Sequence, residues 1–168
     1  SLPSYLDRGE TPSTPSYQQT LEAIKIIGID VPTGKDNAWN VCDDNEVSGW
    51  TSDGTVENAW IKLRLERKAS IKQVALRMKN FRTTSYPIDI YADETLVWSG
   101  NTPKTLGDVY CNIEAPVESD CITIRMRGSA NVRDAFASMT ELSSQKTAPA
   151  KPSSSRYLTI LEVECKCK

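Results

Sequence analysis

Hard oxygen donors are concentrated in one short acidic stretch of the sequence. Asp43, Asp44 and Asn45 are followed by Ser48, so carboxylate, amide and hydroxyl oxygens lie close together along the chain. Calcium takes about six to eight such oxygens, many of them from backbone carbonyls of a bent loop, whereas magnesium prefers a tight octahedron with waters. The stretch is therefore either a cation site, with calcium favoured over magnesium, or a solvated turn in which Asp and Asn cap their own backbone.

A second polar stretch, KNFRTTSYP from Lys79 to Pro87, has the residue types that bind sugars. Sugar recognition needs planar or bidentate donors for pairs of hydroxyls, and an aromatic face for the C–H side of the ring. Those types are present here as Asn80, Arg82, Thr83 and Tyr86. The alternative is that Phe81 and Tyr86 plug the end of the fold while Arg82 pairs with a neighbouring carboxylate.

The sequence offers little for catalysis. It contains no histidine, which removes the commonest general base, the usual nucleophile triads and most zinc sites. Its five cysteines form no CxxC pair; Cys111 and Cys121 either bridge neighbouring strands or are buried free thiols. No motif places a carboxylate pair in a cleft, so we expect a noncatalytic protein.

Composition limits the class of protein further. With 168 residues, 39% hydrophobic and 25% charged, the chain is typical of one soluble globular domain. The net charge of -2 leaves no basic surplus for nucleic acid. No apolar run approaches the ~18 residues of a membrane span. The chain opens SLPSYLDRGE, without a charged start and an apolar run, so we expect any signal peptide to be absent or already removed.

Alternating apolar residues predict the elements that position these groups. Ile61, Leu63 and Leu65 point one way, while the charged residues between them point the other. Similar segments lie near residues 24–31, 74–78, 88–92, 96–100, 109–113, 122–126 and 157–165. About eight short strands with almost no helix predict an all-β antiparallel sandwich, or jelly roll. Trp50 and Trp60 flank a turn beside this pattern, and we interpret both as packing residues.

Two segments fall outside the strand pattern. Residues 1–20, with prolines at 3, 12 and 15, indicate a linker or extended strap. The β-sandwich domain then occupies residues 21–168, interrupted at 128–156 by a polar insertion loop that ends in SSQKTAPAKPSSSR.

Motifs in order along the chain resemble discoidin-like, galactose-binding-like modules. VCDDNEVSGWTSDG resembles their first loop, and AWIKLRLERKASIKQVALRM, NFRTTSYPIDIYADETLVWSGNT and ILEVE resemble the strands that follow. The likeness covers roughly residues 22–165. It is greatest to modules appended to bacterial glycoside hydrolases, including the C-terminal domains of family 2 β-galactosidase-like enzymes.

The resemblance implies a noncatalytic carbohydrate-binding module that tethers an enzyme to a glycan. The expected partners are a glycan, either a galactoside or an acidic polysaccharide, and a catalytic domain in the same chain. An extracellular or periplasmic bacterial location follows from the same likeness. The alternative is a structural accessory domain that packs on the catalytic domain and has no sugar affinity, since one fold hosts many functions.

The resemblance also assigns site residues. In such modules a structural calcium is held by the first loop and closed by a glutamate of the last strand, which here gives Asp43, Asn45, Ser48 and Glu162. Asn45 and Ser48 stand where relatives commonly have Asp and Thr, so the site carries less charge. Trp39, in KDNAWNV, comes from a loop expected at the binding end. The expected carbohydrate-binding set is Trp39, Asn80, Arg82, Thr83 and Tyr86.

Overall fold

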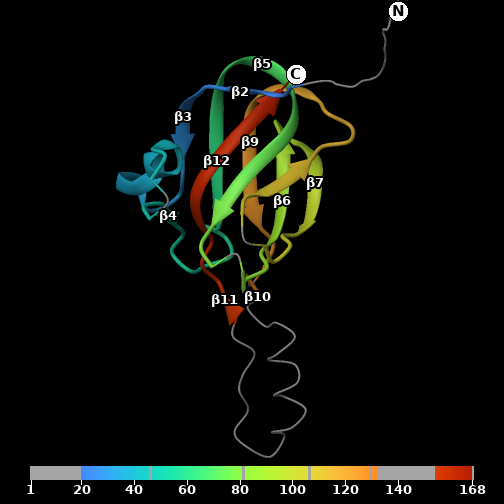
Figure 1. The fold of residues 1–168 in the computed structure, drawn as a ribbon. Coiled ribbons are helices and arrows are strands. Elements are labelled where there is room, and N and C mark those ends of the chain that lie inside the picture. The colour runs from blue at the N-terminus through green and yellow to red at the C-terminus, as the bar shows by residue number, and fades with distance from the viewer. Residues whose placement is uncertain are drawn as a thin grey trace, which may run out of the picture.

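The computed structural model describes residues 20–45, 47–80, 82–105, 107–128, 130–131 and 154–167. Within them the chain forms two layers of antiparallel strands and one short 3-10 helix (Figure 1). The elements are β2 (Glu22–Ile24), β3 (Ile26–Asp30), η2 (Lys35–Cys42), β4 (Trp50–Thr51), β5 (Trp60–Met78), β6 (Pro87–Ala92), β7 (Thr95–Asn101), β8 (Val109–Asn112), β9 (Glu118–Met126), β10 (Ala130–Asn131), β11 (Ser154–Ser155) and β12 (Thr159–Cys167). The predicted antiparallel sandwich is confirmed.

The long strand β5 belongs to both layers. Its first half pairs with β3 and β9, and β6 and β7 extend that layer beyond β9. Its second half pairs with β12 and β8, while β12 also pairs with β2 and β4. A register shift interrupts the pairing of β5 with β9 between Arg64 and Ala69, and Figure 1 shows the strand bending over between its two halves. The two layers therefore share one continuous strand at the side of the sandwich.

The core follows the alternation of the sequence. Ile61, Leu63 and Leu65 are all buried, as are the inward residues of β6 and β9 opposite them. Trp50 is 0% exposed, and its Nε1 donates a hydrogen bond to the Thr33 carbonyl at 2.8 Å. A buried indole that keeps an N–H partner is a stable packing arrangement. The interpretation of Trp50 as a packing residue is therefore confirmed.

Trp60 does not share that role. Because Ile61 points inward, the neighbouring Trp60 points to the outer face of the layer. Its Cα pairs with that of Arg125 on β9, and its side chain is only partly buried. The interpretation of Trp60 as a core residue is therefore wrong, and the reason is the strict alternation of β5.

Gly49 lies where two strands approach too closely for a side chain. A Cβ built there would be 2.6 Å from the Ile160 carbonyl oxygen and 3.1 Å from the Leu161 Cα. Both neighbours belong to the backbone of β12, so they cannot rotate away. We expect Gly49→Ala to push β4 from β12 and to lower the free energy of unfolding by about 1–3 kcal/mol, as overpacking does. Denaturant titration measures this, and an unchanged midpoint would contradict the close approach.

The structure tests several of the sequence expectations only in part. Cys111 and Cys121 lie in β8 and β9 as free thiols. The expected strap over residues 1–20 falls outside the described residues except at its last position, and most of the insertion at 128–156 also falls outside. The ends of that insertion are paired, because β10 and β11 run antiparallel. Across the described ranges no helix is long and apolar enough to cross a membrane.

Candidate functional site

A tight turn after β5 brings three of the expected sugar-binding residues together. The turn is fixed by the Thr83 and Thr84 amides, which donate to the Asn80 carbonyl at 3.0 Å and 2.8 Å. Asn80 has the left-handed backbone angle φ 58, which asparagine tolerates better than most residues. The side chains of Asn80, Arg82 and Thr83 are all exposed. The turn that carries these three exposed side chains lies at the end of the sandwich away from the C-terminus (Figure 1).

Arg82 differs from two other arginines of the domain. Arg77 donates to Asp108 at 2.8 Å, and Arg127 donates to Asp89 at 2.8 Å, so both guanidinium groups have a carboxylate partner. Arg82 makes no hydrogen bond or ion pair to any residue that the structure describes. An arginine carries five N–H donors in a planar fork, so these donors are available to a ligand.

Tyr86 does not provide the expected aromatic face. It is 4% exposed, its amide donates to the Thr102 hydroxyl at 2.8 Å, and its own hydroxyl donates to the Lys79 carbonyl at 2.8 Å. Burial raises the pKa of Tyr86 to about 12. A ring enclosed in this way has no face for a sugar, so the expected stacking role of Tyr86 is corrected. The alternative, in which Tyr86 plugs the end of the sandwich, fits its position.

Tyr86→Phe tests this correction. The change removes only the hydroxyl and leaves the Lys79 carbonyl without its buried partner. We expect the free energy of unfolding to fall by about 0.5–1.5 kcal/mol, the usual net value of one such bond. Glycan affinity should not change, because the ring is enclosed. A clear loss of affinity with unchanged stability would restore Tyr86 to the binding site.

Tyr157 is the aromatic residue at this end that sequence reasoning missed. The start of β12 lies beside the turn at 79–83, because the Lys79 amide donates a hydrogen bond to the Thr159 carbonyl at 3.3 Å. Tyr157 lies two residues earlier and is 51% exposed. Its ring lies against Gly54, where an added Cβ would be 3.1 Å away. The signal was present in the sequence, because Leu158 begins the apolar alternation of the last strand and so leaves Tyr157 facing outward.

Trp39 lies elsewhere. It is in η2, is 49% exposed, and lines a hollow of about 580 Å³ beside β2, β3 and β12. The lining of that hollow includes Cys42, Glu66 and Glu162 and no residue of the turn at 79–86. The structure therefore does not bring Trp39 to Arg82. Its aromatic face is accessible, but on the flank of the sandwich.

The expected cation ligands are arranged around a turn that also caps itself. Asp43 accepts a hydrogen bond from the Asn45 amide at 2.9 Å and one from the Ser48 hydroxyl at 2.7 Å. These bonds, the Ser48 hydroxyl first, lower the pKa of Asp43. The Asn45 side-chain oxygen accepts from the Val47 amide at 3.0 Å. The hydrogen bonds of a capped turn are thus present, and they hold the oxygen donors on one side of the loop.

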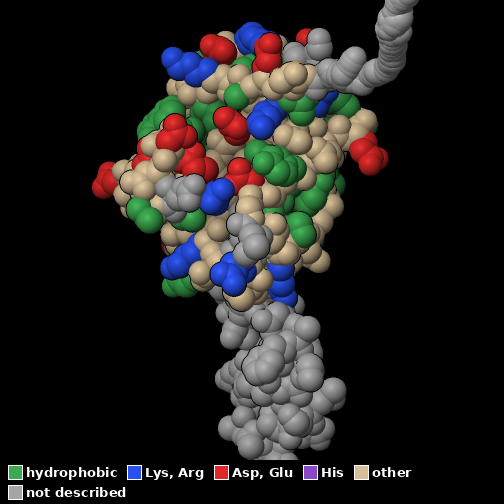
Figure 2. Space-filling model, viewed as in Figure 1, with side chains coloured by type: hydrophobic (Ala, Val, Ile, Leu, Met, Phe, Trp, Pro, Cys, Tyr) green, Lys and Arg blue, Asp and Glu red, His purple; other side chains and the backbone are tan. Residues whose placement is uncertain are grey.

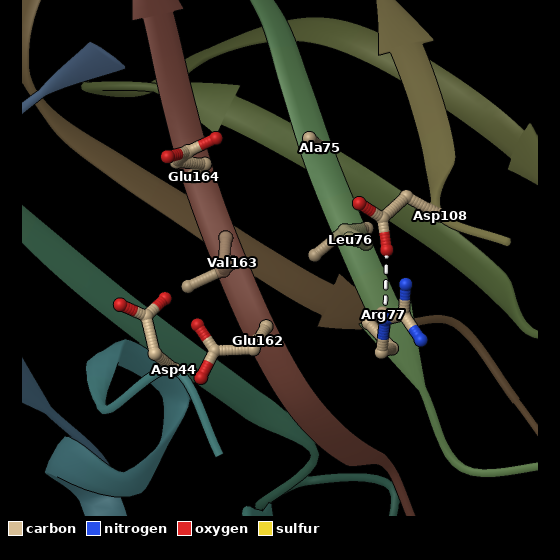
Figure 3. A pocket seen from close by; sticks show the side chains of 8 residues that line it. All are labelled: Asp44, Ala75, Leu76, Arg77, Asp108, Glu162, Val163 and Glu164. Atoms are coloured by element: carbon tan, nitrogen blue, oxygen red, sulfur yellow. Dashed lines mark hydrogen bonds and ion pairs between the residues drawn. The ribbon is translucent and has the colours of Figure 1, made fainter. Parts of the chain in front are cut away.

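The turn leaves one oxygen of Glu162 without a partner. Its Oε2 is buried and has no hydrogen-bond partner. Glu162 and Asp44 both line a hollow of about 180 Å³, and the Glu162 carboxylate is directed toward Asp44 (Figure 3). Burial raises the pKa of Glu162 to about 7; the charges of Asp44 and Asp43 add to the rise, and a hydrogen bond from the Asp44 backbone opposes it. Acidic side chains also gather over η2 and β12 in Figure 2. The negative charge here has no positive partner in the turn itself.

This arrangement fits calcium better than a transition metal. No group of three or more His, Cys, Asp or Glu side chains suited to a metal occurs in the part of the chain that the structure describes. A cation here would therefore need amide, hydroxyl and carbonyl oxygens beside carboxylates, which is the ligand preference of calcium. The unpartnered Oε2 of Glu162 supplies the observation in favour. Asp44 was not among the expected ligands, but it lines the same hollow as Glu162.

Comparisons with known proteins identify the fold. No protein-family model matches the chain, and no curated protein matches it. The CBM32 of AlyQ in complex with 4,5-unsaturated mannuronic acid superposes with a TM-score of 0.63 at 16% identity, over 86% of this chain and 97% of that chain. A pectin binding carbohydrate binding module gives a TM-score of 0.59 at 14% identity, over 84% and 91% of the two chains.

A longer structure matches as well. Truncated AlyQ with CBM32 and alginate lyase domains gives a TM-score of 0.65 at 16% identity, with 89% of this chain covered. This chain spans only 34% of that two-domain chain. The chain therefore has the β-sandwich fold of CBM32 carbohydrate-binding modules, which is the discoidin-like fold that the sequence resembles.

Proposed function

We propose that this domain is a noncatalytic carbohydrate-binding module that binds a glycan at the end of the sandwich formed by the turn at 79–83 and Tyr157. Arg82 holds two neighbouring hydroxyls or an acid group, Asn80 and Thr83 add polar contacts, and Tyr157 supplies the apolar face. Both AlyQ CBM32 and the pectin binding module have this fold and are named for sugar ligands, which supports the class of ligand.

The observation that carries the proposal is the exposed side chain of Arg82 between exposed Asn80 and Thr83, at the end of the sandwich where the start of β12 also carries the half-exposed ring of Tyr157. Tyr157 is anchored by neighbouring backbone: the Leu158 amide donates to the Ser52 hydroxyl at 2.8 Å, and the Ser52 amide donates to the Leu158 carbonyl at 2.9 Å. The turn bearing Arg82 is anchored to the same strand through Lys79 and Thr159. Loop residues on such a rigid frame are where binding usually resides.

Such a site is shallow and wet, so it binds each sugar weakly. We expect dissociation constants of roughly 10 µM to 1 mM, which corresponds to about 4–7 kcal/mol. Weak binding is sufficient for a tether, because a module linked to an enzyme raises the local concentration of that enzyme on a polymer. The AlyQ structure that joins a CBM32 to an alginate lyase domain is an example of a module and an enzyme in one chain.

The proposal extends to a parent enzyme and to a structural cation. A catalytic domain in the same polypeptide and export from a bacterial cell suit a module that meets polymeric glycans. Calcium would be held by Asp43, Asn45, Ser48 and Glu162, with Asp44 close by. It would neutralise the carboxylates and brace the loop on β12, and it would do so whether or not the domain binds sugar.

A glycan screen of the isolated domain tests the proposed function. Neutral galactosides, pectic and alginate oligosaccharides are immobilised, and retention is compared between the wild-type domain and Arg82→Ala. We expect at least one class of glycan to retain the wild type and not the variant. A broad screen without a hit would overturn the proposal and favour a structural accessory domain.

A further inference from the structure

The outer face of the layer that contains β9 has a hollow that none of the residues described at 79–83 lines. Its volume is about 350 Å³. Five of its lining residues come from three adjacent strands: Trp60 and Lys62 of β5, Thr123 and Arg125 of β9, and Tyr91 of β6. Asp93 and Glu94, in the turn after β6, complete the lining. The size is at the lower end for ligand sites, which suits one or two sugar rings.

Strand register places these side chains together. Trp60 pairs with Arg125, so the indole and the guanidinium stand side by side on one row. Lys62 pairs with Thr123, and Thr123 also pairs with Tyr91 on its other side, which makes a second row across three strands. Residues that pair directly project to the same face of a sheet. The arrangement is therefore set by backbone pairing and does not depend on a loop.

The two cations of this hollow lack acidic partners. Arg125 donates to the Val56 carbonyl at 3.3 Å, and neither Arg125 nor Lys62 forms an ion pair with a residue that the structure describes. Asp89, the cross-strand neighbour of Arg125, already accepts from Arg127 at 2.8 Å.

One of the two carboxylates that line the hollow already has a hydrogen-bond partner. Asp93 accepts a hydrogen bond from the Ser119 hydroxyl at 2.8 Å, away from the two strand rows. Lys62 and Arg125 thus form no ion pair with a carboxylate of the described residues, although Asp93 and Glu94 line the same hollow and Asp89 is the cross-strand neighbour of Arg125. An anionic ligand would give these two cations a direct partner, because charge-assisted bonds from arginine to a carboxylate are among the strong hydrogen bonds of proteins.

The two aromatic residues restrict the type of anion. Trp60 and Tyr91 are partly exposed on the flat outer face, on either side of the cations. A flat aromatic face matches the C–H side of a sugar ring, and the Thr123 hydroxyl can hydrogen-bond to a ring hydroxyl. We propose that this hollow is a second glycan site, specific for a uronate unit, separate from the end of the sandwich that bears Arg82.

Amide chemical shifts of the ¹⁵N-labelled domain during titration test this site. The probes are short oligogalacturonates and oligoalginates, with a neutral galacto-oligosaccharide as control. We expect the acidic probes to shift amides near Trp60, Tyr91 and Arg125 in a saturable way. Shifts confined to residues 79–83 and Tyr157, or no shifts with either acidic probe, would overturn the second site.

Matched charge variants separate recognition from a general attraction. Arg125→Gln should weaken the acidic probe about tenfold or more, and Lys62→Gln should weaken it by a smaller factor. Arg64→Gln is the control, because Arg64 has the same charge on the same face of β5 but does not line the hollow. An equal loss from Arg64→Gln would show that the anion is attracted only by overall charge.

Each of the two proposed sites can be disproved without affecting the other. Arg82→Ala should leave the shifts near Trp60 and Arg125 intact, while Arg125→Gln should leave binding at the end of the sandwich intact. If Arg82→Ala also abolishes the shifts near Trp60, the second site is wrong, since those shifts would then report binding at the end. A domain that binds nothing at the end but still shows saturable shifts at the hollow would overturn only the proposed function.

Discussion

Calcium is expected to raise the unfolding midpoint of the wild-type domain by about 5–10 °C over the same protein in chelator. A ligand present at about 100 times its dissociation constant stabilises the folded state by ~2.7 kcal/mol, and each kcal/mol moves the midpoint of a domain of this size by about 2–4 °C. The physical reason is the buried Oε2 of Glu162, which faces Asp44 and has no hydrogen-bond partner. Thermal scans with calcium and with chelator measure the difference.

Glu162→Gln should be more stable than the wild type in chelator and less stable than the wild type in calcium. In chelator at pH 8, the wild type keeps a partly buried carboxylate, with Oε2 lacking a hydrogen-bond partner, beside Asp43 and Asp44, whereas the variant has a neutral amide that can donate to those carboxylates. We expect the variant to be about 1 kcal/mol or more stable than the wild type in chelator, because an unpaired buried charge is costly. In calcium the variant should gain little. If the wild type melts at the same temperature with calcium and with chelator, the stretch Asp43–Ser48 is only a capped turn and not a cation site.

Arg82→Ala is expected to abolish detectable binding of neutral glycans without unfolding the domain. Loss of one charged contact weakens binding by roughly 1.5–3 kcal/mol, which takes a weak site beyond the range of detection. Arg82→Lys should recover only part of the affinity, because an ammonium cannot hold two hydroxyls in one plane. Tyr157→Ala should weaken binding as well, through the lost ring face.

Stability controls belong with this prediction. Arg82 is exposed and forms no ion pair within the described residues, so its removal should leave the free energy of unfolding unchanged within about 0.5 kcal/mol. Arg64→Ala removes an exposed arginine of another region and should leave affinity at the end of the sandwich unchanged. Equal losses from the two variants would show that Arg82 acts only through net charge.

The fold was predictable because its strands alternate. The inward residues Ile61, Leu63 and Leu65 of β5 are buried, as the period of two requires. The apolar run at the end of the sequence forms the central strand β12. The same rule, applied without exception, also places Trp60 on the outer face. The interpretation of Trp60 as packing failed because the size of the residue was given more weight than its position in the alternation.

The binding end was only partly predictable. The turn residues Asn80, Arg82 and Thr83 are neighbours in sequence, so their proximity required only that the segment be a turn. The choice between Tyr86 and Tyr157 depended on long-range contacts: Thr102 and the Lys79 carbonyl enclose the first, while pairing of β12 with β5 brings the second to the turn. Trp39 was misplaced for a similar reason, since η2 packs beside β12 on the flank.

Titration calorimetry of the wild type and Arg82→Ala, against a neutral glycan that the screen returns, tests the central claim most directly. We expect a saturable heat for the wild type with a dissociation constant between roughly 10 µM and 1 mM, and no measurable heat for a folded Arg82→Ala variant. A wild-type affinity that Arg82→Ala leaves untouched would contradict the assignment of the glycan site to this end of the sandwich.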